Sequence, residues 1–302
     1  MGHLFRYFRA AFWVLSLLIA VNGAGAAETT DAFYERFVND VKEGRPLVTT
    51  VYVALCDNDS QGIIPVKNRK ICDGDFPENN MYWKGDGGIY GYLKSHQWKR
   101  VKSTKNSDGA VIIEDVWHKR LWPGKKLKEK GVTKPFSAYV VAKAYRGSNI
   151  HDAMVDYLKA VNNDTSQVIK IDEDKSISAG GGSHLAGYIG HDYFMDPYPD
   201  SREYKELVDV HKNGTGKLAK GAFALACISN EFVRPAIERE SVYIMALNNF
   251  LTYPSAWTVG GIIDGVAALG SGYEIYKSYT KAFAKGQNCG LKWAKNAFSF
   301  GP

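Results

Sequence analysis

Residues 183–190 read SHLAGYIG and residues 221–226 read GAFALA, and each stretch runs directly into a reactive side chain, His191 or Cys227. Both stretches are short and apolar, which is typical of buried β-strands. Three more stretches of this kind are 47–55 (LVTTVYVAL), 136–144 (FSAYVVAKA) and 242–247 (VYIMAL). The sequence therefore predicts a sheet built around these five strands.

The segments between and after these strands have the spacing of amphipathic helices. Apolar residues recur at helical spacing in four of them: 150–161, 201–212, 256–269 and 273–285. Strands that alternate with helices predict a three-layer α/β sandwich, a mostly parallel sheet with helices on both faces. We also expect a helix at 89–101 and a short strand, in a hairpin, at 111–117.

The first 26 residues have the three parts of a secretory signal peptide. Arg6 and Arg9 give a positive start, an apolar run follows at 10–21, and small residues lead to a cleavage point after Ala26 or Ala27. The apolar run is well short of the roughly 20 residues that span a bilayer. We therefore expect removal of residues 1–26, a single domain over 27–302, a secreted or periplasmic location and no stable membrane span.

The charge of the mature chain is small. Loss of Arg6 and Arg9 leaves 36 basic residues against 32 acidic ones, a formal charge of +4 instead of +6. This excess is too weak and too dispersed to predict a nucleic-acid partner. The one basic run, KKLKEKGVTK at 125–134, is interpreted as a solvated loop.

Four cysteines in an exported chain can be oxidised. Cys56 and Cys72 are separated by 16 positions around a polar loop, and they predict a disulfide. Two arrangements remain open for Cys227 and Cys289: a second disulfide, or a free thiol at Cys227. The function depends on which one forms.

The positions of His191 and Cys227 indicate a possible catalytic pair. When the two strands are parallel neighbours, both side chains leave the sheet at its carboxyl edge, where α/β proteins gather catalytic groups. A thiol beside an imidazole is the minimal arrangement for acyl transfer, because the imidazole takes the thiol proton and later protonates the leaving amine. The alternative is a buried structural cysteine near a histidine that caps a helix.

The order strand, helix, strand, helix, strand-His, helix, strand-Cys resembles that of the caspase-like cysteine peptidases, which include metacaspases, clostripain and gingipains. The matching residues are 188–191 (YIGH) and 224–229 (ALACIS). The resemblance implies a caspase-like fold, a peptide or protein substrate, His191 as general acid or base, and Cys227 as nucleophile.

Four charged residues are candidates for substrate binding. The turn Cys56-Asp57-Asn58-Asp59 resembles the Cys-x-Asn-Asp turn of metacaspases, so Asp57 or Asp59 would attract Arg or Lys before the scissile bond. Arg146, after the second strand, would instead suit an acid. Asp192 stands where the family usually has glycine, which puts a carboxylate near the developing oxyanion.

Three hypotheses follow. The first is an exported cysteine peptidase, the second an inactive caspase-fold binding or scaffold protein in which Cys227 is not free, and the third another exported hydrolase or transferase that uses Cys227. No metal site or cofactor is predicted, because zinc, calcium-loop and phosphate-loop spacings are incomplete or missing in the sequence.

Overall fold

The computed structural model describes residues 29–61, 69–196, 202–212 and 216–299. The predicted signal peptide lies outside these described residues. Within them, no helix is both long enough and apolar enough to cross a membrane.

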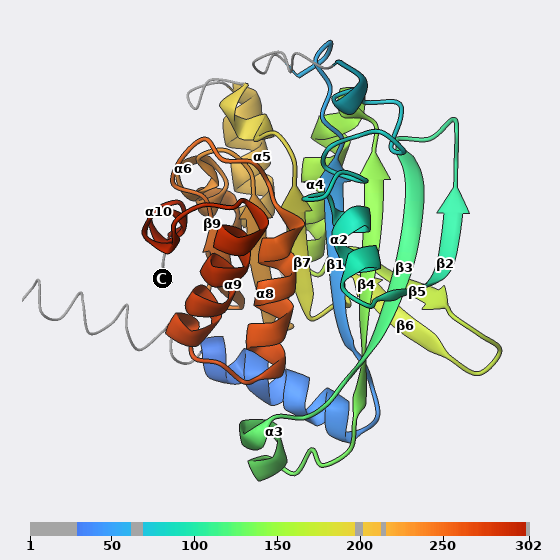
Figure 1. Cartoon of the computed structure of the whole chain (residues 1–302), viewed down its shortest axis with the longest axis vertical. Helices are drawn as coiled ribbons and strands as arrows, with labels where there is room; N and C mark the ends of the chain where they lie inside the picture. Colours follow the sequence, from blue (N-terminus) through green and yellow to red (C-terminus); the bar gives the residue numbers. More distant parts are fainter. Residues whose placement is uncertain (1–28, 62–68, 197–201, 213–215, 300–302) are drawn as a thin grey trace, which may run out of the picture.

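In the described part of the chain, a seven-stranded sheet forms the middle layer, in the order β2-β3-β4-β1-β7-β8-β9 (Figure 1). The parallel strands are β4 (Phe136–Tyr145), β1 (Leu47–Ala54), β7 (Leu185–Ile189), β8 (Lys220–Leu225) and β9 (Val242–Leu247). All five strands expected from the sequence are present. The chain builds outward from β1 to β4 on one side and to β7 on the other, so the strand order reverses between β1 and β7.

Two helical layers cover the sheet, which confirms the three-layer α/β sandwich. One layer holds the first helix (residues 29–42), α2 (Ile89–Ser95), α8 (Ala256–Ala267), α9 (Gly272–Gly286) and α10 (Leu291–Asn296). The other holds α4 (Ile150–Val161), α5 (Arg202–Lys212), α6 (Ser229–Phe232) and α7 (Arg234–Ile237). Because both faces are covered, every residue of β1, β7, β8 and β9 is buried, which explains their continuous apolar runs.

Smaller elements complete the structure around the parallel strands and their helices. They are the antiparallel strands β2 (Lys99–Lys105) and β3 (Val111–Leu121), the hairpin β5 (Ser166–Lys170) and β6 (Ser176–Gly180), the helix α3 (Lys125–Glu129), and the 3-10 turns η1 (Arg69–Ile71), η2 (Gly147–Asn149) and η3 (Tyr193–Met195). The hairpin expected at 111–117 is therefore present, with a longer second strand.

The helix predicted at 89–101 is wrong in its second half. It ends at Ser95, and Gln97 adopts a left-handed backbone conformation (φ 64°) that a helix cannot continue through. The chain then pairs as β2 with β3. β2 lies at the sheet edge, and its exposed lysines are typical of an edge strand protected against pairing with other chains.

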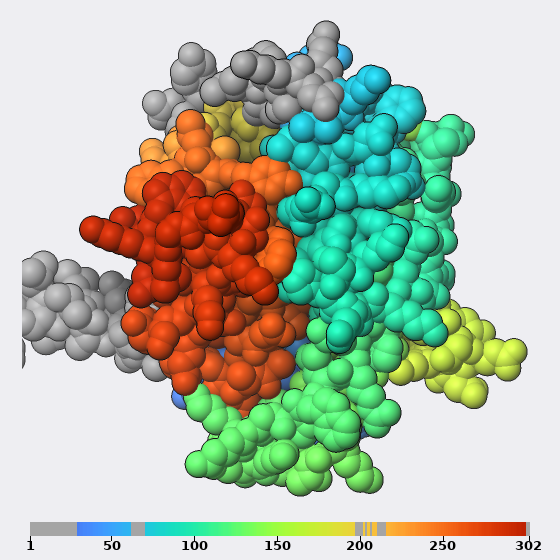
Figure 2. Space-filling view, viewed as in Figure 1, coloured from blue at the N-terminus to red at the C-terminus, as the bar shows by residue number. Residues whose placement is uncertain are grey.

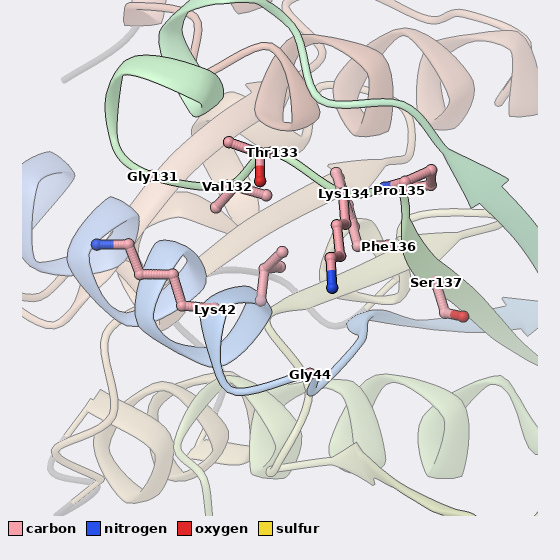
Figure 3. Close-up of a pocket in the computed structure, with 10 residues that line it drawn as sticks. Lys42, Gly44, Gly131, Val132, Thr133, Lys134, Pro135, Phe136 and Ser137 are labelled. Atoms are coloured by element: carbon pink, nitrogen blue, oxygen red, sulfur yellow. The ribbon is translucent and has the colours of Figure 1, made fainter.

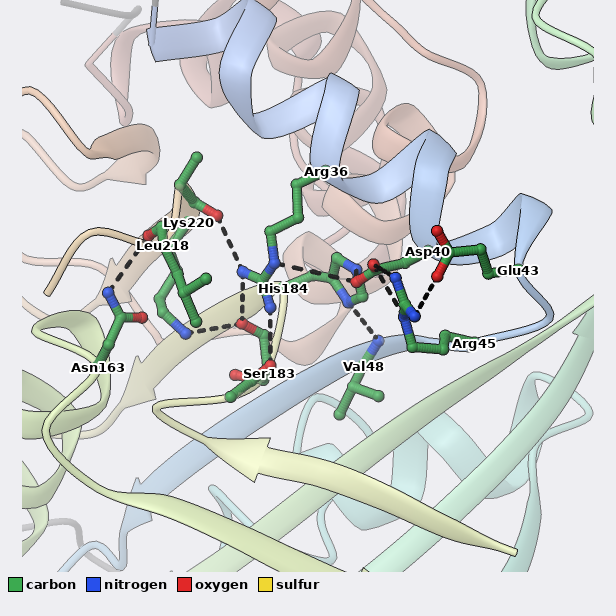
Figure 4. Close-up of polar contacts among 12 residues, drawn as sticks. Arg36, Asp40, Glu43, Arg45, Val48, Asn163, Ser183, His184, Leu218 and Lys220 are labelled. Carbon is green, nitrogen blue, oxygen red and sulfur yellow. Dashed lines mark hydrogen bonds and ion pairs between the residues drawn. The ribbon is translucent and has the colours of Figure 1, made fainter.

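A polar cluster fastens the first helix to the amino edge of the sheet (Figure 4). Arg36 of this helix donates to the carbonyls of Gly182 (2.8 Å), Ser183 (3.2 Å) and Ala219 (2.9 Å). The fully buried amino group of Lys220 donates to Gly181 (2.9 Å) and Ser183 (2.7 Å) in the same turn, and burial lowers its pKa well below the ordinary value. Carbonyl oxygens, rather than carboxylates, therefore accept the hydrogen bonds of this buried side chain.

The same cluster contains a neutral histidine. The backbone N–H of Val48 donates to Nδ1 of His184 at 3.2 Å, so the proton of the neutral ring is on Nε2, which lies 3.0 Å from Asp40 Oδ2. Burial lowers the pKa of His184 to about 4. His184 is thus a structural link between the first helix and β1.

Cys56 and Cys72 form the predicted disulfide, with Cα atoms 4.6 Å apart. It joins the end of β1 to the segment before α2.

Replacing both Cys56 and Cys72 by Ser is expected to lower the free energy of unfolding by about 3 kcal/mol, because the open chain gains entropy when the loop is no longer closed. Urea unfolding of the oxidised protein measures this. Cys289→Ser, at a free thiol, is the control and should unfold like the wild type. Equal stability of the double variant and the wild type would contradict the structural role of this bond.

Candidate functional site

His191 and Cys227 follow the carboxyl ends of two neighbouring strands at equivalent positions. Ile189 of β7 pairs with Leu225 of β8 and, on its other side, with Val53 of β1. His191 and Cys227 each follow this row by two residues. Parallel strands lie about 4.8 Å apart, so their backbones meet at the carboxyl edge, beside the point where the strand order reverses.

A carboxylate holds the His191 ring. Nε2 of His191 lies 2.9 Å from Oδ1 of Asp196, which directly follows η3. A carboxylate only accepts hydrogen bonds, so Nε2 carries the proton and Nδ1 keeps the lone pair. The hydroxyl of Tyr188 donates to the His191 carbonyl at 2.7 Å and fixes the backbone. Nδ1 is therefore the nitrogen that can accept a proton.

Cys227 is a free, half-buried thiol. Its S–H donates to the Thr252 carbonyl, with 3.8 Å between sulfur and oxygen, and among the described residues no hydrogen bond joins the thiol to the His191 imidazole. Burial raises the pKa of Cys227. The resting group is thus a protonated thiol. Cys289 is also free, so the second disulfide considered from the sequence does not form.

The residue after the thiol is held in an unfavourable conformation. Ile228 lies in the left-handed region (φ 51°, ψ 27°), which costs a β-branched residue on the order of 1–3 kcal/mol. The turn is locked by Ser229, whose hydroxyl donates to the Ala224 carbonyl (2.7 Å) and accepts from the N–H of Asn248 (2.9 Å). Residues held in such conformations often cluster at functional sites.

Asp192 lies inside the protein. Its side chain is 0% exposed, Oδ1 accepts the Phe194 N–H at 3.0 Å, and Oδ2 has no hydrogen-bond partner among the described residues. Burial raises the pKa of Asp192 to about 8. At neutral pH the group is therefore an uncharged carboxyl, not the carboxylate expected beside the oxyanion.

The other predicted substrate contacts lie at the ends of β1 and β4. Asp57 Oδ1 accepts the Asp59 N–H (3.0 Å) and Oδ2 accepts the Ser60 hydroxyl (2.6 Å), so this carboxylate organises its own turn. Asp59 is exposed. Arg146 forms an ion pair with Asp75 and donates to the carbonyls of the β2–β3 turn, so its charge is already used within the protein.

The loop that contacts the thiol carries two exposed apolar side chains. Phe250 and Leu251 are 52% and 62% exposed on the loop that offers the Thr252 carbonyl to Cys227. The same loop accepts the N–H of Ile228 at the Phe250 carbonyl (3.2 Å), so it is tied to the Cys227 turn.

Three contributors to this site were not predicted: Asp196, Ile228 and Thr252. Asp196 lies only five residues after His191, and its acidic side chain was a signal that the sequence offered. The strain at Ile228 and the contact from Thr252 depend on tertiary structure, so no local sequence pattern predicts them. Among the described residues, no group of three or more His, Cys, Asp or Glu side chains is arranged to hold a metal ion.

Asp192→Asn is expected to change how stability depends on pH. A raised pKa means that the folded protein holds a proton that the unfolded chain releases near pH 4, so wild-type stability falls as the pH rises from about 4 to 8. The neutral amide avoids this loss, on the order of 5 kcal/mol by pH 8. Urea unfolding at a series of pH values measures it, with exposed Glu173→Gln as the matched control. Parallel curves for Asp192→Asn and the wild type would contradict the neutral buried carboxyl.

Comparison of the chain with models of protein families, with curated proteins and with solved structures finds no match.

Proposed function

We propose that this protein is an exported cysteine peptidase of the caspase-like type, with Cys227 as nucleophile and His191 as general base and acid. The observation that supports this most is the register of β7 and β8, because a free cysteine and a histidine whose ring faces a carboxylate follow paired positions of these neighbouring strands. The strained turn at Ile228 supports the same assignment.

The proposed reaction starts from the neutral pair. Because the pKa of Cys227 is raised, the proton passes to Nδ1 of His191 as the sulfur attacks the peptide carbonyl carbon. The imidazolium then gives this proton to the leaving amine as the C–N bond breaks, which leaves a thioester on Cys227. Water, deprotonated by His191, hydrolyses the thioester and restores the thiol. Asp196 stabilises the imidazolium through Nε2.

The step requires one local rearrangement. The S–H of Cys227 must turn from the Thr252 carbonyl toward His191. Contacts of this kind are often loose in unliganded enzymes and tighten when substrate binds. We propose that the substrate carries Arg or Lys near the scissile bond, attracted by Asp57 and Asp59, because Arg146 is occupied by Asp75.

A second candidate function is an inactive binding or scaffold protein on the same fold. The observations that favour it are the raised pKa of Cys227 and the bond from its thiol to Thr252 rather than to His191. In this version Cys227 is free but unreactive, because the structure gives no bridge to Cys289.

Fluorogenic peptides that place Arg, Lys or Asp before the reporter group test the peptidase. We expect turnover of the basic peptides, its abolition in Cys227→Ala and His191→Ala, and a fall of roughly 10–100-fold in Asp196→Asn, which loses the orienting charge. Cys289→Ala, the matched variant at the other free thiol, should retain full activity.

Two results would count against the peptidase. Turnover that survives in Cys227→Ala would assign the activity to another group. Absence of turnover in the correctly folded, exported wild type, over peptides of both charges, would favour the scaffold. A preference for peptides with Asp over those with Arg or Lys would contradict only the substrate-binding role of Asp57 and Asp59, and would leave the peptidase assignment standing.

A further inference from the structure

The amino edge of the sheet, opposite the candidate site, carries a projecting lobe. Residues 122–134, which include α3, stand out from the body at this end of the molecule (Figures 1 and 2). Trp122 at the start of the lobe is 78% exposed, more than any other large apolar side chain that the structure describes. A single exposed indole is common on protein surfaces, so its meaning depends on the residues around it.

The lobe is strongly basic. Residues 122–134 contain five lysines and one glutamate, a charge of +4 where the whole sequence has +6. Leu127 is fully buried and anchors α3, and the other four side chains of this helix are exposed. Lys126 is paired with Glu274 (2.7 Å). In the part of the chain that the structure describes, Lys128, Lys130 and Lys134 have no carboxylate partner.

A hollow lies at the base of the lobe, between its last residues and the end of the first helix (Figure 3). Its volume is about 470 Å³, Lys42 and Lys134 border it, and Thr133 adds a hydroxyl. Two helices end here, at Gly44 (φ 80°) and Gly131 (φ 89°). Each helix end contributes at most about half a negative charge, so the two full lysine charges still leave the hollow positive.

We propose that the 122–134 lobe, together with Lys42, docks the protein on a membrane surface that contains anionic phospholipid. Tryptophan favours the boundary between headgroups and acyl chains, and clustered lysines are attracted to anionic headgroups. The hollow between Lys42 and Lys134 offers a place for a headgroup phosphate. The protein lies on the bilayer without crossing it, and the candidate site at the carboxyl edge faces away from the membrane (Figure 1). This proposal is independent of the peptidase activity.

Co-sedimentation with vesicles tests the proposal on the exported protein, with its N-terminus established by mass spectrometry. Vesicles of phosphatidylcholine with phosphatidylglycerol are compared with vesicles of phosphatidylcholine alone. We expect the wild type to bind the anionic vesicles only, and more weakly as salt is raised. The pair Lys128→Gln and Lys130→Gln should lower the partition coefficient on the order of tenfold, and Trp122→Ser several-fold.

Matched controls come from other exposed positions. The pair Lys99→Gln and Lys105→Gln removes the same charge from β2, and Val168→Ser removes an exposed apolar group from the β5–β6 hairpin. Both should bind like the wild type. Equal loss in the β2 pair, equal binding to neutral vesicles, or binding to a DNA duplex but not to vesicles would overturn the proposal. Urea unfolding of each variant verifies that the protein is folded.

Discussion

The parallel hydrogen-bond ladder through β1, β7 and β8 is the constraint on which the site depends. It holds Val53, Ile189 and Leu225 in one row, and the two candidate catalytic residues each follow that row by two positions. A slip of one residue would turn one of the two side chains to the opposite face of the sheet. The register is protected because β1, β7 and β8 are buried on both faces, and because Arg36 and Lys220 fasten their amino ends.

Two groups at the carboxyl edge that results, Cys227 and Asp192, carry no charge at neutral pH. Cys227 is protonated and Asp192 is uncharged, both because burial penalises their anions. The group that can bring charge to the chemistry is the Asp196 carboxylate behind His191. A neutral thiol that loses its proton only during attack is compatible with a peptidase that is slow until substrate binds, and also with an inactive scaffold. Thiol reactivity, rather than the fold, separates these two functions.

Much of the framework could be predicted because burial imposes a recognisable pattern of apolar residues on the sequence of each strand and helix. The five apolar strands, α4, α5, α8 and α9 all appear near the expected positions, and the Cys56–Cys72 disulfide was predicted from the spacing of the two cysteines around a short polar loop. The first helix was missed although Phe33, Phe37 and Val41 recur at four-residue spacing, a pattern the sequence did contain. The false continuation of α2 has a different cause, since the left-handed Gln97 and the pairing of β2 with β3 arise from tertiary structure.

The site was predictable only in outline. Strand ends pointed to His191 and Cys227, but the inward burial of Asp192 and the capture of Arg146 by Asp75 depend on segments distant in sequence. The role of the basic run at 125–134 also depends on tertiary structure, because the fold sets Lys42 beside the last residues of the run.

The rate at which iodoacetamide alkylates Cys227, mapped by mass spectrometry, tests the central claim most directly, because thiolate formation limits this reaction. At neutral pH we expect His191→Ala to slow labelling of Cys227 while leaving Cys289 unchanged, since the imidazole on the neighbouring strand assists loss of the thiol proton. Equal labelling of Cys227 in the wild type and in His191→Ala would show that the two residues are neighbours without chemical coupling, and would contradict the account.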